Sequence, residues 1–113
     1  MSKSSVLTAA MRAWTIMGIS PDISQVESRF PQIVGIIGLP DLNEIEVVLS
    51  SASEELLKAL SSWKPSTDLT MRAIVPIETL GLSHERLRGG GWQLQGYWEG
   101  DDGQVAFGAV EIA

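Results

Sequence analysis

The sequence of 113 residues has no cysteine and only one histidine, His84. The absence of cysteine excludes disulfide bonds, thiol nucleophiles, and zinc or iron–sulfur sites that depend on cysteine ligands. Because His84 carries the only imidazole, it is also the only side chain that ordinarily changes its charge near neutral pH. These shortages favour a non-catalytic protein over an enzyme, and they predict neither a cofactor nor a metal site.

Basic residues are scarce as well: eight Lys and Arg oppose 14 Asp and Glu, which gives a net charge of −6 at pH 7. An acidic surface repels phosphate, so the composition argues against a nucleic-acid partner. No apolar run approaches the roughly 20 residues that span a bilayer, and the N-terminus lacks the pattern of an export signal. We expect a cytoplasmic protein without a membrane span.

The remaining composition is typical of one globular domain over residues 1–113, because 44% of the residues are hydrophobic. The apolar spacing changes near residue 64, which predicts a helical half over 4–64 and a β-rich half over 69–113. We therefore predict an α+β fold in which an N-terminal bundle of short helices packs on a small C-terminal antiparallel sheet of about three strands.

Apolar residues three and four positions apart predict short helices in the N-terminal half. Leu7, Met11 and Trp14 form such a face on the first helix. The expected helices cover 4–18, 20–31, 41–49 and 51–63, the last of them capped by Ser51. The uncharged segment 32–39 fits either a buried helical turn or a strand, and periodicity alone does not decide between them.

The clearest strand signal is a hairpin over 92–112, because residues 100–103 combine Gly and Asp as a tight turn requires. The expected register places Trp98 opposite Val105. Residues 71–75 are expected to supply a third strand, since an isolated hairpin is only marginally stable.

Titratable residues are densest around His84, which suggests an alternative function as a small-molecule-binding protein or a minimal enzyme. In that interpretation His84 and Glu78 supply acid–base catalysis, arginines bind a carboxylate or phosphate, and tryptophans form a stacking wall. The candidate ligand-binding residues are Arg72, Arg86, Arg88, Trp92 and Trp98. Contiguous charges on a short connector more often form a solvated surface, so we prefer a structural role for this group.

Residues 77–88 resemble the core of a helix-turn-helix, with Gly81 at the turn and apolar residues at the positions that the motif requires. The resemblance implies a DNA-binding regulator as a second alternative. The glycines at 89–91 argue against it, because they truncate the second helix of the motif. The preferred interpretation is a connector with a helix of one or two turns that Ser83 caps and the glycines end.

The main prediction is a protein-interaction or assembly module that self-associates into a homo-oligomer. It depends on the uncharged stretch over 30–39 and on a C-terminal strand that few Lys or Pro residues protect from pairing with another strand. The predicted interface residues are Ile33, Ile36, Ile37, Tyr97, Val110 and Ile112. A component of a virion or of a secretion apparatus would suit such a module.

Overall fold

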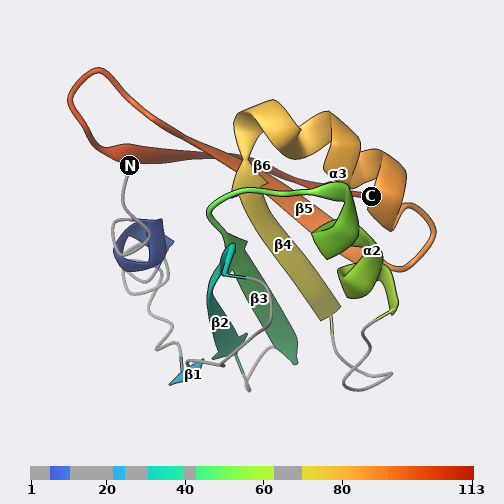
Figure 1. Ribbon diagram of the computed structural model, residues 1–113. Helices are drawn as coiled ribbons and strands as arrows, with labels where there is room; N and C mark the ends of the chain where they lie inside the picture. Colours follow the sequence, from blue (N-terminus) through green and yellow to red (C-terminus); the bar gives the residue numbers. More distant parts are fainter. Residues whose placement is uncertain (1–5, 11–21, 25–30, 40–42, 63–69) are drawn as a thin grey trace.

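The computed structural model describes residues 6–10, 22–24, 31–39, 43–62 and 70–113. These ranges contain a six-stranded mixed sheet, whose strands lie side by side in the order in which they occur in the sequence (Figure 1). The strands are β1 (Asp22–Ser24), β2 (Ile33–Leu39), β3 (Glu44–Leu49), β4 (Thr70–Pro76), β5 (Trp92–Glu99) and β6 (Val105–Ile112).

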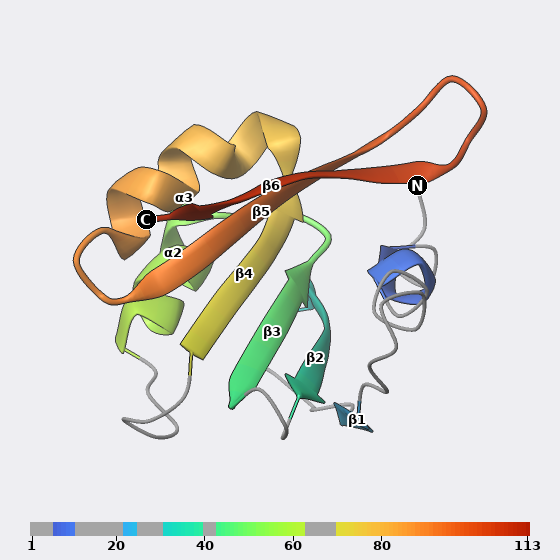
Figure 2. The ribbon, with the colours of Figure 1, turned by 180° about the vertical axis from the view of Figure 1, so that it is seen from behind.

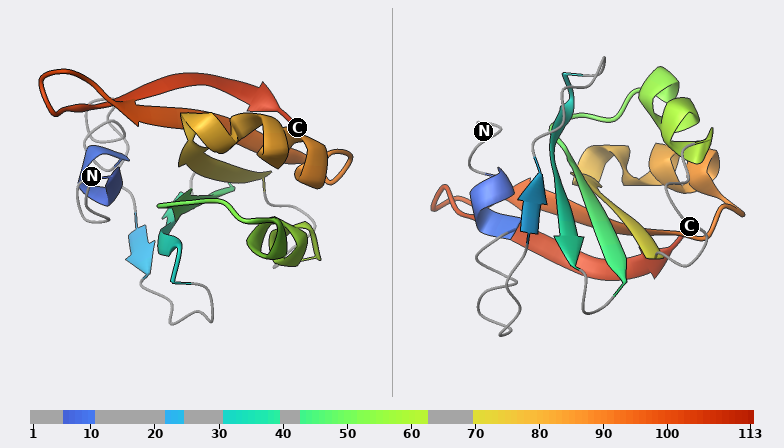
Figure 3. Two further views of the ribbon diagram at one scale, coloured as in Figure 1. Left: turned by 45° about the horizontal axis from the view of Figure 1, so that its top comes forward. Right: turned by 90° about the horizontal axis from the view of Figure 1, so that it is seen from below.

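The centre of the described sheet is parallel and its two sides are antiparallel. β4 pairs in parallel with both β3 and β5, whereas β1–β2, β2–β3 and β5–β6 pair in antiparallel. The two parallel connections pass through α2 (Glu54–Ser62) and through the 3-10 turn η2 (Ile77–Thr79) followed by α3 (Leu80–Leu87). Right-handed crossovers that advance in one direction place their helices on one face, and Figure 3 shows α2 and α3 on the same side of the sheet.

The larger apolar core lies between this face and the two helices. Alternate strand residues point into it, because successive side chains of a strand face opposite ways. Its buried members are Val47, Leu49, Leu56, Leu57, Leu60, Met71, Ala73, Val75, Leu87, Trp92 and Leu94.

The opposite face (Figure 2) packs against the helical segment at residues 6–10. Val6 and Ala10 of that segment are buried, and Leu7 lies so close to Gly35 that a Cβ atom there would be 3.1 Å from Leu7 Cδ1. Glycine therefore permits this close approach. The Tyr97 hydroxyl, buried on the same face, donates a hydrogen bond of 2.6 Å to a main-chain carbonyl of β3.

The predicted helical bundle over 4–64 is wrong, as is the predicted antiparallel sheet of three strands. β1, β2 and β3 occupy segments for which the sequence predicts helices over 20–31 and 41–49 and either a helical turn or a strand over 32–39. The described chain does combine separate helices and strands, in agreement with the α+β class. Residues 6–10 are helical as predicted, whereas the rest of the expected first helix lies outside the described residues.

The error at β3 has a definite physical cause. Ile45, Val47 and Leu49 point toward α2, whereas Glu46 and Val48 point to the other face. Side chains that alternate between the two faces, several of them β-branched, favour a strand. Apolar residues also recur three positions apart in the same segment, and that spacing suggested a helix.

Several local predictions are confirmed. α2 occurs where the last helix was expected, although its cap is Ser53 and not Ser51: the Leu56 amide donates to Ser53 Oγ at 3.3 Å. β4 matches the predicted third strand at 71–75 but pairs in parallel. A short helix does fill the connector before β5, although α3 begins before Ser83.

The predicted hairpin over 92–112 is present as β5 and β6, in a different register. Trp98 lies opposite Ala106 and not opposite Val105, and a β-bulge interrupts the pairing between Gln95 and Tyr97. Trp98 lies on the turn side of the bulge, so the turn itself shifts the register by one residue, and the bulge shifts the pairs beyond it by one more.

Candidate functional site

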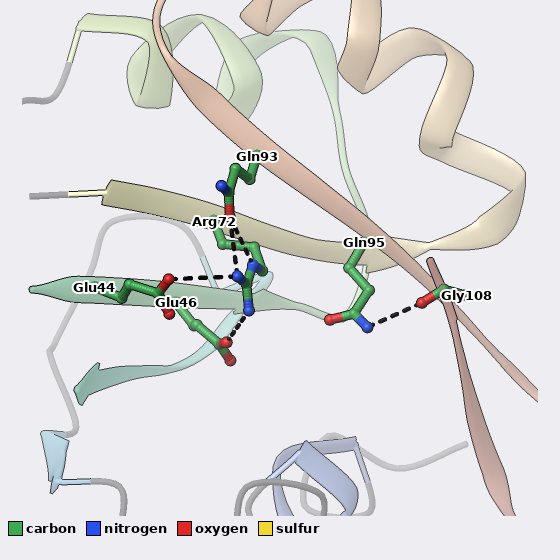
Figure 4. Close-up of polar contacts among 6 residues, drawn as sticks. All are labelled: Glu44, Glu46, Arg72, Gln93, Gln95 and Gly108. Carbon is green, nitrogen blue, oxygen red and sulfur yellow. Dashed lines mark hydrogen bonds and ion pairs between the residues drawn. The ribbon is translucent and has the colours of Figure 1, made fainter. Parts of the chain in front are cut away.

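Arg72 lies at the centre of a polar group on the sheet face opposite α2 and α3 (Figure 4). Its Nη1 donates to Glu46 Oε1 at 2.8 Å, and its Nε and Nη2 donate to Gln93 Oε1 at 3.2 and 2.9 Å. Glu44 Oε1 lies 3.6 Å from Nη2 and forms a second ion pair. We call these four residues, Glu44, Glu46, Arg72 and Gln93, the Arg72 cluster.

Strand register assembles the Arg72 cluster from three strands. Glu46 of β3 lies beside Arg72 of β4, which lies beside Gln93 of β5. Neighbouring residues of in-register strands share a face of the sheet, so these side chains meet although the hydrogen-bonded partners are 26 and 21 residues apart in sequence. The central pair is nearly dry, because the side chain of Glu46 is 0% exposed and that of Arg72 is 10% exposed.

The Arg72 cluster has the chemistry of a structural clamp. Nε, Nη1 and Nη2 of the guanidinium each donate to a residue of a neighbouring strand. An anionic ligand would have to displace Glu46 or Gln93 from these bonds, in surroundings that already contain two carboxylates. Breaking a buried ion pair is costly, so we interpret the cluster as a device that holds β3, β4 and β5 in register.

His84 and Arg86 lie on α3, on the other side of the sheet from Arg72. His84 Nε2 is 3.0 Å from Glu111 Oε1 of β6, and Arg86 Nη2 donates to Glu54 Oε1 of α2. The hydrogen bond that Arg86 donates to Glu54 and the negative charge of Glu54 raise the pKa of Arg86 above its ordinary value. These contacts fasten α3 to β6 and to α2.

Within the described residues, the predicted catalytic residues His84 and Glu78 share neither a hydrogen bond nor an ion pair. Glu78 is exposed in η2, whereas His84 contacts Glu111. In the same ranges, no three His, Asp or Glu side chains gather into a group that could hold a metal ion. A structural role explains the contacts that these side chains make.

The predicted ligand-binding residues do not converge on one site. Arg72 lies on one face of the sheet, and Trp92 is buried under the helices on the other. Trp98 is 41% exposed on β5, and Arg88 is exposed immediately after α3. Gly81, the proposed turn residue of a helix-turn-helix, lies inside α3, so the segment does not form the turn that this motif requires.

The six predicted interface residues differ in burial. Val110 is 43% exposed and Ile112 is 80% exposed, and both belong to β6. The other four are buried or partly buried within the chain: Ile33, Ile36, Ile37 and Tyr97. Exposed apolar side chains among the predicted interface residues are therefore concentrated on β6.

β6 is an edge strand: in the described sheet it pairs with β5 and with no other strand. Figure 3 shows it along the outer margin of the sheet. The direction of its main-chain groups follows from the bonds at its two ends. At the C-terminal end, the Ala113 amide donates to the Trp92 carbonyl at 3.0 Å. Because inward and outward residues alternate in an antiparallel ladder, Ile112 and Val110 direct their N–H and C=O groups away from β5.

The hydrogen bond at the turn end of β6 also shows which residues direct their main-chain groups away from β5. The Gly100 amide donates to the Gln104 carbonyl at 2.8 Å, so Val105 and Phe107 also direct their main-chain groups outward. All four outward residues have their side chains on the face that carries the Arg72 cluster, since the register places Ile112 beside Gln93. We call Val105, Phe107, Val110 and Ile112 the β6 edge.

Two features strengthen β5–β6 next to this edge. Gln95 Nε2 donates to the Gly108 carbonyl at 2.9 Å across the bulge (Figure 4). Glu111, whose side chain lies on the helix face, contacts His84 as described above. These contacts anchor β6 to β5 and to α3 within one copy of the chain.

The sequence reasoning missed Glu46, Gln93 and Glu111 as structurally important residues. Glu46 carries a local signal, because a charged residue that alternates with Ile45 and Val47 points to the second face of a strand. Its partnership with Arg72 depends on the order and direction of the strands, which local patterns do not contain.

No protein-family model, curated protein or solved structure matches this chain. In the described ranges, none of the helices has the length and apolar character needed to cross a membrane.

Proposed function

We propose that this protein is a non-catalytic assembly module that self-associates by pairing the β6 edge of one copy with the β6 edge of another. The observation that carries the proposal is the combination of four outward-directed main-chain positions with the exposed Val110 and Ile112 side chains. The proposal keeps the cytoplasm as the location, with which a chain without cysteine is compatible.

The chemistry of the edge suits a strand as its partner. Outward N–H and C=O groups form a template for a further strand, whose main-chain bonds supply affinity. Many edge strands carry lysine, proline or an inward-pointing charge that discourages such pairing. β6 has no charged residue from Val105 to Val110 and no proline along its length.

The same composition favours a second copy as the partner. The chain has a net charge of −6, so two copies repel each other wherever their acidic surfaces meet. The uncharged stretch of β6 allows two edges to approach without opposing like charges, and it offers apolar side chains to each other.

Sedimentation velocity over a range of micromolar concentrations tests the proposal. We expect the unmodified chain to form dimers, and we expect Ile112→Lys and Val110→Pro to raise the dimer dissociation constant by about tenfold or more. Each substitution acts twice in a symmetric dimer: Val110→Pro removes two hydrogen bonds of about 1 kcal/mol each, and Ile112→Lys replaces two apolar cross-strand contacts by charges. Proline is tolerated at position 110 because the amide there faces outward.

Ile77→Lys is the matched control, because Ile77 is an exposed apolar residue of η2 at 41% exposure and lies over Gly96 on the face of the sheet opposite the side chains of the β6 edge. It should leave the dissociation constant unchanged. A chain that stays monomeric at every concentration, or a dimer that survives both edge substitutions, contradicts the proposal.

A further inference from the structure

We infer that the two β6 edges pair in one antiparallel register, with a two-fold axis between Gly108 and Ala109, so that the partner's sheet continues the first. The inference rests on the proposed function and specifies its geometry. In this register Phe107 lies opposite Val110 of the partner, and Val105 lies opposite Ile112 of the partner. The two sheets then form one continuous sheet.

Main-chain geometry selects this register. Two residues that exchange hydrogen bonds across an antiparallel pair must both direct their N–H and C=O groups toward the other strand. The outward residues of β6 are Val105, Phe107, Val110 and Ile112, and the spacing is two, then three, then two. That spacing reads the same in both directions, so the axis through its centre brings all four outward residues opposite outward residues. Any other antiparallel register matches at most two of them.

The β-bulge is what makes the edge self-complementary. A regular strand alternates inward and outward residues without interruption, whereas the irregularity between Gln95 and Tyr97 of β5 corresponds to the extra residue at Gly108 and Ala109 of β6. The bulges of the two copies meet at the proposed axis. Neither has a side chain larger than a methyl group, so the two bulges face each other without bulky groups between them.

Side-chain chemistry agrees with the same register. The four outward residues share the face of the sheet that carries the Arg72 cluster, so pairing joins their apolar side chains into one stripe. Ile112, which is 80% exposed in one copy, gains Val105 of the partner as its cross-strand neighbour. Glu111, the one charged residue of β6, lies opposite Ala106 of the partner and so meets no like charge.

Engineered cysteines test the register directly, because the natural chain has no thiol. Val105→Cys and Ile112→Cys are prepared as separate variants, and sedimentation velocity first establishes that each forms dimers. After mixing and mild oxidation, we expect a disulfide-linked heterodimer, since directly opposite residues lie within disulfide reach. Each variant alone should remain uncrosslinked, because the two copies of either position are seven residues apart along the strands, about 24 Å.

The matched control is a mixture of Ala106→Cys and Ile112→Cys, in which the two thiols lie on opposite faces of the joined sheet. It should give little disulfide. If dimers form but the control mixture, or a single variant, cross-links as readily as the expected mixture, the register is wrong and the proposed function stands. If no dimers form, the proposed function itself fails.

Discussion

The Arg72 cluster makes a quantitative prediction about stability. Arg72→Met retains most of the side-chain volume but removes the bonds to Glu46 and Gln93 and the ion pair with Glu44. Glu46, which is 0% exposed, then loses the guanidinium that balances its charge. Removing one partner of a buried ion pair typically costs about 3–5 kcal/mol, and we expect the free energy of unfolding to fall by that amount.

The double variant Arg72→Met, Glu46→Leu separates the ion pair from the packing. Replacing both members of a buried pair by apolar residues of similar size is often neutral, so the double variant should recover most of the loss. The matched control is Arg88→Met, the same substitution at an exposed position after α3, where we expect a change within about 0.5 kcal/mol.

Urea unfolding provides the measurement, with the fluorescence of the four tryptophans as the signal. A domain of this size has a stability of roughly 6–17 kcal/mol, so all three variants are expected to fold. A loss below about 1 kcal/mol in Arg72→Met would refute the reasoning, because it would mean that the two carboxylates are stabilised without the guanidinium. A double variant that is less stable than Arg72→Met would also contradict it.

Three further predictions concern β5. Tyr97→Phe removes the donor to the Leu49 carbonyl and should lower stability by about 1–2 kcal/mol in urea unfolding; an unchanged midpoint would show that the bond contributes nothing. Gly96→Ala places a Cβ atom 2.5 Å from Ile77 Cδ1, the end of a side chain that is 41% exposed and can move aside, so it should cost less than about 1 kcal/mol in urea unfolding; a larger loss would show that Ile77 is held in place. Burial raises the pKa of Tyr97 to about 12 from the unfolded value of 10.0, so the native state retains a proton that the unfolded state releases. Stability from this group is complete below pH 10 and decreases as the pH rises through 12, by up to about 3 kcal/mol; alkaline unfolding of Tyr97→Phe should lack this component, and an identical pH dependence in both proteins would contradict the assignment.

Local sequence patterns predicted the elements of the C-terminal half and, in the N-terminal half, α2. The turn at 100–103 was visible because Gly and Asp tolerate the backbone angles of tight turns, and α2 was visible through Leu56, Leu57 and Leu60 on one helical face. The register of the hairpin was not predictable from these signals, because the turn shifts the pairs next to it by one residue and the bulge opposite Gly96 shifts every pair beyond it by one more.

The N-terminal half was harder to predict because β2 and β3 lie inside the sheet. β2 has an apolar side chain or glycine at every position, so it shows no alternation from which its two faces can be distinguished. β3 offers both a two-residue and a three-residue spacing. The parallel pairing of β4 with β3 and β5 then decides which side chains meet, and no local pattern encodes that pairing.

The β6 edge was likewise predictable from the sequence only in part. The sequence alone indicated that the last strand lacks protective charges and that Val110 and Ile112 belong to an interface. It also proposed Ile37 and Tyr97, which the fold buries within the chain. Which main-chain groups point outward depends on the hairpin register and its bulge, and it required the structure.

Amide hydrogen exchange of the unmodified chain, measured residue by residue at low and high protein concentration, tests the central claim most directly. We expect the amides of Val105, Phe107, Val110 and Ile112 to gain protection as the concentration rises, because pairing of two β6 edges would occupy those four donors. The inward amide of Glu111 should be protected at both concentrations. Exchange at the four outward amides that stays fast and independent of concentration would contradict the claim that β6 is the surface of assembly.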